Sequence, residues 1–185
     1  MALRTRRTTR QRHDPSKNFV GFLVGDVLYA VRIEVVREIV NPLPVVALPR
    51  APHAIRGVAD YRGLVVPVLD LRERFGLVPA ESRRTKWIVI DASRVGLRDA
   101  STPSPEAPLH AALVVDQVTD VFGTGGSEVR PSPPLGEGDR VRGIEGVTSY
   151  GDRLVFVLDA RAFAQIAQEA LSVPPPAMGH AGALR

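Results

Sequence analysis

The sequence predicts a mainly β protein built from two copies of one small β-barrel unit, followed by a short C-terminal helix. Three observations support this fold class. Gly and Pro number 16 each among 185 residues, which favours many turns over long helices. Short runs rich in valine, leucine and isoleucine recur between turn residues, as strands do. One eighteen-residue pattern also occurs twice, and sets of short strands of this size usually close into small barrels because closure removes exposed edges.

The repeated pattern lies at residues 55–72 and 144–161. The first copy reads IRGVADYRGLVVPVLDLR and the second reads IEGVTSYGDRLVFVLDAR, with nine of the 18 aligned positions identical and no gap. A weaker similarity upstream relates residues 33–39 to residues 115–121. Because both pairs of segments occur in the same order, the chain contains a duplicated unit of roughly 80–90 residues.

Strands and turns can be placed in order along the chain. The opening strands FVGFLV and VLYAVRI are joined by a turn at Gly25-Asp26, and residues 34–40 fit either a short helical turn or a strand. Prolines make residues 42–53 an irregular crossing, and residues 93–108 read as an exposed loop. The strand that begins at 55–58 and the strand LVVPVLDL form a hairpin whose turn is Arg62-Gly63. Further strands are expected at 86–92 and 111–115, and a second hairpin at 142–149 and 153–159. The last element is an amphipathic helix at 161–171.

The composition divides the chain into four parts. We expect a basic disordered arm at 1–16, a first barrel half at 17–79, a second barrel half with the helix at 80–171, and a disordered tail at 172–185. The net charge of +4 comes from the arm, because residues 1–17 carry +5 and the rest of the chain therefore carries −1. The arm is either a solvated segment or a means of steering the protein to an anionic surface.

Most enzymatic and metal chemistry is not supported by the sequence. The chain has no cysteine, which excludes disulfides and thiolate sites and fits a reducing cytoplasm. No apolar run reaches the roughly 18 residues that span a bilayer. The four histidines lack metal-ligand spacing and are expected at the surface, and no nucleophile elbow or Walker loop occurs. A binding module without cofactor or metal remains, with a nucleic-acid-binding barrel as the alternative, although the slightly acidic body with few aromatics does not favour it.

Three positions of the repeat invite a structural and a functional interpretation. Asp70 and Asp159 end a Val-Leu-Asp strand, where a carboxylate caps a following helical turn or, less commonly, takes part in catalysis. Gly57 and Gly146 are expected where the backbone bends or approaches another segment closely. Arg62 has no counterpart in the second copy, which favours a recognition role over a solvated hairpin tip.

The first copy and its flanks resemble the signature of the CheW-type chemotaxis coupling proteins. Residues 57–71, GVADYRGLVVPVLDL, resemble the family pattern G-[VI]-x-N-L-R-G-x-[VI]-x-P-[VI]-[VIL]-D-L. The opening FVGFLVGDVLYAVRIEVVREI and the later ALVVDQVTDV are also similar, so the resemblance covers residues 17–170. Asp60 and Tyr61 replace the usual Asn-Leu, which bears on the preference for a partner.

This resemblance implies a fold of two SH3-like five-stranded β-barrels and a role without enzymatic activity. Such proteins bridge the cytoplasmic tip of chemoreceptors and the regulatory domain of the histidine kinase CheA. The resemblance therefore implies a cytoplasmic scaffold that meets the membrane only indirectly, through receptors, and binds no nucleic acid. The receptor tip is expected in the groove between the barrels, as a helix in a groove.

The resemblance also implies binding residues, by position. The residues implied for receptor binding are Val36, Glu38, Gly57, Arg62, Val115 and Val118. Those implied for kinase binding are Ile55, Leu64, Val66, Arg130 and Leu135. Glu38 and Arg62 either pair with each other or reach to the receptor, and opposite charges there would set register and specificity more than affinity. The three valines are equally well explained as core residues, and Gly57 as a backbone requirement.

Overall fold

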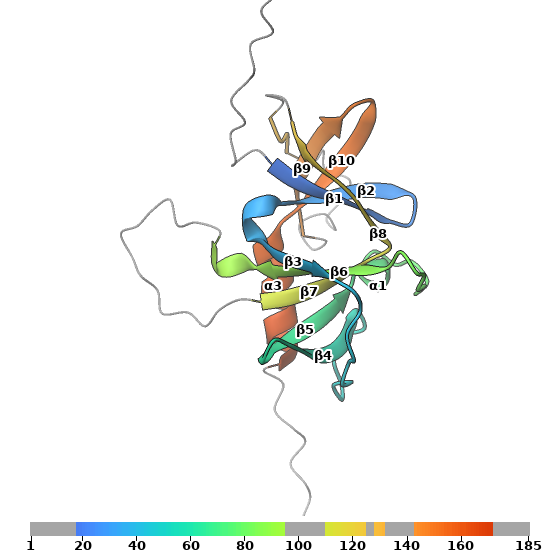
Figure 1. Ribbon diagram of the computed structural model, residues 1–185, viewed down its shortest axis with the longest axis vertical. Helices are drawn as coiled ribbons and strands as arrows, with labels where there is room; N and C mark the ends of the chain where they lie inside the picture. Colours follow the sequence, from blue (N-terminus) through green and yellow to red (C-terminus); the bar gives the residue numbers. More distant parts are fainter. Residues whose placement is uncertain (1–17, 95–109, 125–127, 132–142, 172–185) are drawn as a thin grey trace, which may run out of the picture.

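The computed structural model describes residues 18–94, 110–124, 128–131 and 143–171, and its strands form two five-stranded sheets, one above the other in Figure 1. The first sheet has the order β8-β1-β2-β10-β9. Its strands are β1 (Asn18–Val24), β2 (Val27–Arg32), β8 (Gln117–Gly123), β9 (Ile144–Tyr150) and β10 (Arg153–Leu158). All neighbours pair antiparallel except β2 and β10, which are parallel.

The second sheet has the order β3-β6-β7-β5-β4, with β5 and β7 parallel. Its strands are β3 (Val36–Val40), β4 (Ile55–Tyr61), β5 (Leu64–Asp70), β6 (Lys86–Asp91) and β7 (His110–Val115). The helical elements are η2 (Ile33–Val35), α1 (Leu71–Arg74), η3 (Ala92–Arg94) and α3 (Ala160–Leu171). The segment that fitted either a helical turn or a strand is thus both, η2 followed by β3. The fold class of a mainly β protein with two SH3-like barrels is confirmed.

The expected division into barrel halves at 17–79 and 80–171 needs correction. The two sheets exchange strands: β1 and β2 join β8, β9 and β10, whereas β3, β4 and β5 join β6 and β7. Figure 1 shows this as blue β2 beside orange β10 in one sheet, and as teal β5 beside yellow β7 in the other. Each sequence unit therefore supplies strands to both barrels. The antiparallel pairs β1–β8 and β3–β6 and the parallel pairs β2–β10 and β5–β7 all join a strand of one unit to a strand of the other.

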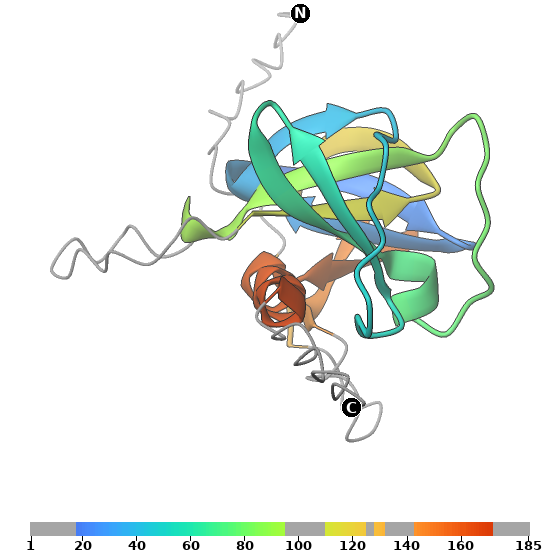
Figure 2. The same ribbon diagram turned by 90° about the horizontal axis from the view of Figure 1, so that it is seen from below.

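The core has three parts, one inside each barrel and one shared between them. The shared cluster takes side chains from β1 and β2 of the first sheet, from β5, β6 and β7 of the second sheet, and from α3. Figure 2 shows α3 and α1 on the same side of the strands, and α3 contacts β5, β6 and β7. On the apolar face of the predicted helix, Phe163 and Ala167 are buried and Ile166 is half-buried, and the neighbouring Ala164 is buried as well. Because the two barrels share this cluster, we expect them to unfold together in one transition.

The repeat aspartates cap helices, as predicted. The Asp70 carboxylate accepts from the backbone N–H of Arg72 and Glu73 at the start of α1, at 2.7 and 3.3 Å. The Asp159 carboxylate does the same for Arg161 and Ala162 at the start of α3, at 2.9 and 3.2 Å.

The repeat glycines allow close backbone approach, also as predicted. A Cβ at Gly57, whose φ is +142°, would lie 2.1 Å from the carbonyl oxygen of Val46, and one at Gly146 would lie 2.3 Å from that of Arg130. Each contact belongs to a single β-bridge that a crossing segment makes with the repeat strand, Val46 with Val58 and Arg130 with Val147.

One expectation about the histidines is wrong, and the expectations for three segments fall outside the described residues. His110 is buried in β7, where its Nε2 lies 2.9 Å from a guanidinium nitrogen of Arg37, so it is not the surface histidine that was expected. The reason is that both faces of β7 are covered, by the shared core and by the second barrel's interior. The basic arm, the C-terminal tail and most of the loop at 93–108 lie outside the described residues.

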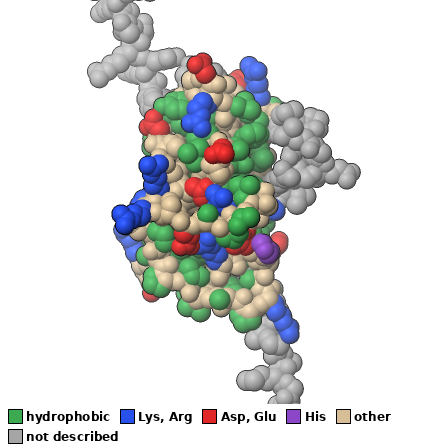
Figure 3. All heavy atoms as spheres, turned by 90° about the vertical axis from the view of Figure 1, so that its right-hand side faces the viewer, with side chains coloured by type: hydrophobic (Ala, Val, Ile, Leu, Met, Phe, Trp, Pro, Cys, Tyr) green, Lys and Arg blue, Asp and Glu red, His purple; other side chains and the backbone are tan. Residues whose placement is uncertain are grey.

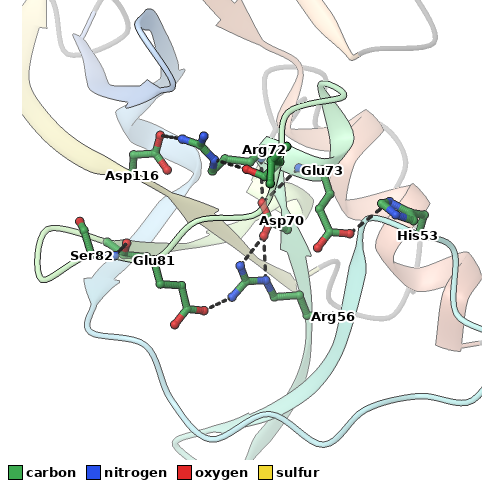
Figure 4. Close-up of polar contacts among 10 residues, drawn as sticks. His53, Arg56, Asp70, Arg72, Glu73, Glu81, Ser82 and Asp116 are labelled. Carbon is green, nitrogen blue, oxygen red and sulfur yellow. Dashed lines mark hydrogen bonds and ion pairs between the residues drawn. The ribbon is translucent and has the colours of Figure 1, made fainter.

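An ion pair fastens the two sheets to each other (Figure 4). Arg72 of α1 donates to the Asp116 carboxylate at 2.6 Å and to the carbonyl oxygen of Val78 at 2.7 Å. The same Asp116 oxygen accepts from the backbone N–H of Gly25, in the turn between β1 and β2, at 2.7 Å. The second sheet, through α1, is thereby tied to the first sheet at its β1–β2 turn.

We expect Arg72→Ala to lower the free energy of unfolding by roughly 1–3 kcal/mol, because Asp116 loses a charge-assisted hydrogen bond in a partly covered site. The control is Arg153→Ala on β10, whose exposed side chain should contribute less than about 0.5 kcal/mol. Urea denaturation followed by circular dichroism measures both. Equal losses for the two variants would show that Arg72 does not fasten the sheets.

Candidate functional site: the Glu38–Arg62 surface

The tip of the β4–β5 hairpin meets β3 through a polar contact. Glu38 accepts from the Tyr61 hydroxyl with one carboxylate oxygen and from the Arg62 guanidinium, at 2.7 Å, with the other. Since β3 and β4 are the two edge strands of the second sheet, this contact closes the second barrel. The hydrogen bond to Glu38 raises the pKa of Tyr61 above its ordinary value, because the phenolate would face the carboxylate.

The first barrel is closed in the same way at the equivalent positions. The Tyr150 hydroxyl of β9 donates to the Asp120 carboxylate of β8 at 2.6 Å, which raises the pKa of Tyr150. The first barrel has no equivalent of Arg62, since Gly151 stands at that position. The second barrel therefore differs from the first by an exposed cation at its closing contact.

Arg62 is held at the hairpin tip by its neighbours. Its backbone has a φ of +54°, and Asp60 accepts from the N–H of Gly63 at 2.7 Å, which fixes the turn. The guanidinium lies 5.6 Å from the centre of the Tyr61 ring, a cation–π contact. Asp60 thus forms the turn and is not an ion-pair partner of Arg62, whose side chain remains 72% exposed. The ion pair between Arg62 and Glu38 is therefore accessible at the surface.

Of the six residues implied for receptor binding, four are at least partly accessible and two are buried. Glu38 and Arg62 come together on the surface, and Val36 on β3 and Val118 on β8 are half-buried against the shared core from different sheets. Val36 and Val118 therefore border the seam between the sheets. Val115 is buried in the shared core and Gly57 is buried beneath Val46, so neither offers a side chain to a partner.

The residues implied for kinase binding are also divided. Leu64 is half-buried and Arg130 is exposed, whereas Ile55 and Val66 belong to the core. Leu135 lies outside the described residues. The sequence interpretation missed the outward-facing neighbours Val65 and Val46, which are 67% and 68% exposed. Because side chains alternate between the two faces of a strand, Val65 next to the buried Val66 should point outward. The unbroken apolar run of β5, however, does not show which face is outward.

One face of the described protein carries charges of both signs. Figure 3 shows acidic and basic side chains in the same central area of one face, with a few further Lys and Arg side chains at its edge. Within the described ranges, no group of three or more His, Asp or Glu side chains could hold a metal ion. No helix in the described part of the chain is long and apolar enough to cross a membrane.

The fold and this site define a duplicated double-barrel β protein with a polar contact closing each barrel. The family model described as CheW-like domain matches residues 18–168, and the chain belongs to that family. "Probable chemotaxis protein CheW" of Rhizobium etli is 26% identical over 155 residues, covering 83% of this chain and 92% of that protein. "Chemotaxis protein CheW" of Bacillus subtilis is 27% identical over 161 residues, covering 87% and 95%.

A solved structure agrees with this assignment. The scaffolding protein TtCheW from Thermoanaerobacter tengcongensis superposes with a TM-score of 0.63 at 26% identity, covering 77% of this chain and 88% of that one. "Protein FrzA" of Myxococcus xanthus is 30% identical over 122 residues, covering 66% of this chain and 68% of that protein. The chain is therefore a CheW-type chemotaxis protein of the scaffold or adaptor class.

Proposed function

We propose that this protein is a non-enzymatic cytoplasmic scaffold that couples chemoreceptors to a CheA-type histidine kinase. The observation that carries the proposal is the exposed Glu38–Arg62 pair, which lies on a CheW-type double barrel at positions implied for receptor binding. The partners would be the cytoplasmic tip of a chemoreceptor and the regulatory domain of the kinase. Contact with the membrane would be indirect, through the receptor.

The positions of the residues implied for receptor binding support different roles for them. Glu38 and Arg62 would form the charged rim, and Val36 and Val118 would supply apolar contact at the seam. Gly57 and Val115 are buried, and they would affect binding indirectly, through the conformation of the strands near the rim.

The kinase contact would use the outer face of the second barrel. Leu64 and the exposed Val65 and Val46 would supply apolar contact there, while Ile55 and Val66 support their strands from the core. Arg130, on the crossing segment of the first barrel, would add a charged contact, and Leu135 remains a proposed contact as well.

A pull-down with the regulatory domain of a CheA kinase from the same organism tests this proposal. The full chain should be retained by the immobilised domain, and Val65→Asp should weaken retention without unfolding the chain, because it places a charge in an apolar contact. The control is Leu154→Asp, at the equivalent exposed repeat position on the first barrel. Failure to bind any such domain, with the protein folded, would overturn the proposal.

We expect Arg62→Glu to weaken receptor coupling by about 1–3 kcal/mol, roughly 5- to 150-fold in affinity, because it places two carboxylates at one rim contact. The free energy of unfolding should change by less than about 1 kcal/mol, because the Arg62 side chain is exposed. The control is Arg153→Glu, which makes the same charge change at the other hairpin. Co-sedimentation with receptor-containing membranes measures coupling. If Arg62→Glu unfolds the chain, Arg62 is structural.

A further inference from the structure

The two repeat aspartates occupy equivalent places down to their backbone contacts. The N–H of Asp70 donates to the carbonyl oxygen of Ala54, and that of Asp159 donates to Gly143, both at 2.8 Å and both at the repeat spacing. In each case one carboxylate oxygen, Oδ1, caps the following helix. The second carboxylate oxygen can therefore be compared between the two copies.

In the first copy, Asp70 Oδ2 binds a guanidinium. Arg56 donates to it through Nε at 2.8 Å and pairs through its outer nitrogen with Glu81, as Figure 4 shows. Arg56 lies at a β-bulge, where the pairing register shifts between Ile55 and Gly57, and a bulge redirects the side chain it carries. The result is a carboxylate–guanidinium–carboxylate arrangement in which Asp70 is 0% exposed.

In the second copy, the arginine is replaced. The same bulge recurs between Val157 and Leu158, but the bulged residue is Glu145. Glu145 pairs with Arg32 of β2, and among the described residues Asp159 forms no ion pair. Asp159 is also only half-buried, unlike Asp70.

A cavity of about 360 Å³ lies at this place. Its lining includes the buried apolar side chains Val35, Leu158 and Ala160, and its charged lining includes Asp159 and Glu34 besides the Arg32–Glu145 pair. Arg161 also lines it, so the lining holds three carboxylates and two guanidinium groups. The cavity thus combines apolar walls with a carboxylate whose counterpart in the same chain holds an arginine.

We propose that this cavity binds an arginine side chain presented by a partner protein. The arginine methylenes would lie on Val35, Leu158 and Ala160, and the guanidinium would donate to Asp159 Oδ2, as Arg56 does to Asp70. Guanidinium suits this place better than ammonium because two N–H groups of its planar fork can reach one carboxylate oxygen, as Nε and Nη2 of Arg56 reach Asp70 Oδ2. The cavity lining includes neither Glu38 nor Arg62, and the proposal does not rest on the function proposed above.

Titration of the full chain with N-acetyl-arginine amide, followed by NMR of backbone amides, tests this proposal. Saturable shifts should centre on Val35, Glu145 and Asp159, with a Kd on the order of 1–10 mM, as a partly exposed ion pair allows. The citrulline analogue has the same shape without the charge and should not saturate. Equal shifts with both compounds, or none with arginine, would overturn the proposal.

Two variants sharpen the test. Asp159→Asn keeps an oxygen for the helix cap but removes the charge, and should weaken arginine binding roughly 5- to 10-fold. The double variant Arg32→Glu/Glu145→Arg rebuilds the arrangement of the first copy, and should abolish arginine binding because an internal guanidinium fills the cavity. Unchanged binding by both folded variants would contradict the assigned site. The readout requires neither receptor nor kinase, so it fails or succeeds independently of the coupling proposal.

Discussion

Gly57→Ala is expected to destabilise the protein by about 3–5 kcal/mol. The added Cβ would lie 2.1 Å from the carbonyl oxygen of Val46, and the φ of +142° is strained for any other residue. Relief would require the crossing segment to leave β4, which would break the bridge between Val46 and Val58. The midpoint of urea unfolding, read from the fluorescence of the single, buried Trp87, measures this loss.

The control for this prediction is Gly63→Ala in the neighbouring turn. Gly63 also has a positive φ, +80°, but a Cβ there meets nothing within 4 Å, so the cost should be limited to about 1–2 kcal/mol of backbone strain. The difference between the two variants isolates the close approach of the crossing segment. Equal costs would mean that this segment yields easily, and Gly57 would then be free to have a direct role in binding.

Asp70→Ala is expected to cost about 3–4 kcal/mol. The change removes the cap of α1 and leaves the Arg56 guanidinium with Glu81 alone, in a place where Asp70 was fully buried. Breaking one partner of a buried pair costs about 3–5 kcal/mol, and the remaining pair with Glu81 offsets part of that loss. The same urea titration measures it.

Asp159→Ala is the matched variant in the second copy. It removes an equivalent cap but no internal ion pair, so it should cost only about 1 kcal/mol. A loss as large as that of Asp70→Ala would show that the cap, not the Arg56 pair, provides the stability. It would also mean that the two copies do not differ in how an arginine stabilises their aspartates.

The duplication visible in the sequence predicted the architecture but not the pairing of strands. Counting identities between residues 55–72 and 144–161 identifies two units, and turn residues place most strands. It does not reveal that β1 and β2 pair with strands of the other unit, because strand exchange leaves hydrophobic patterns unchanged. The pairing partners are set by the shared core and by strand contacts, antiparallel and parallel, between residues far apart in the sequence.

The site was predicted in part, for similar reasons. The contact of Glu38 with Arg62 was one of two alternatives left open by the sequence. The Tyr61 hydroxyl was not expected to bind Glu38, because a tyrosine next to a turn carries no signal of its partner. Val66 was interpreted as a contact residue but is buried. The apolar run of β5 does not reveal this, since the strand is buried on both faces over most of its length. The Arg56–Asp70 pair was also missed, because a bulge that redirects one side chain leaves no trace in composition or periodicity.

The most direct test of the proposed coupling function is kinase autophosphorylation in reconstituted membranes containing receptor and CheA-type kinase, with and without this protein. Phosphate incorporation should rise when the protein is added, and should rise much less with Arg62→Glu, which disturbs the exposed pair. No rise with the folded protein, together with no binding to the kinase regulatory domain in a direct titration, would contradict the account.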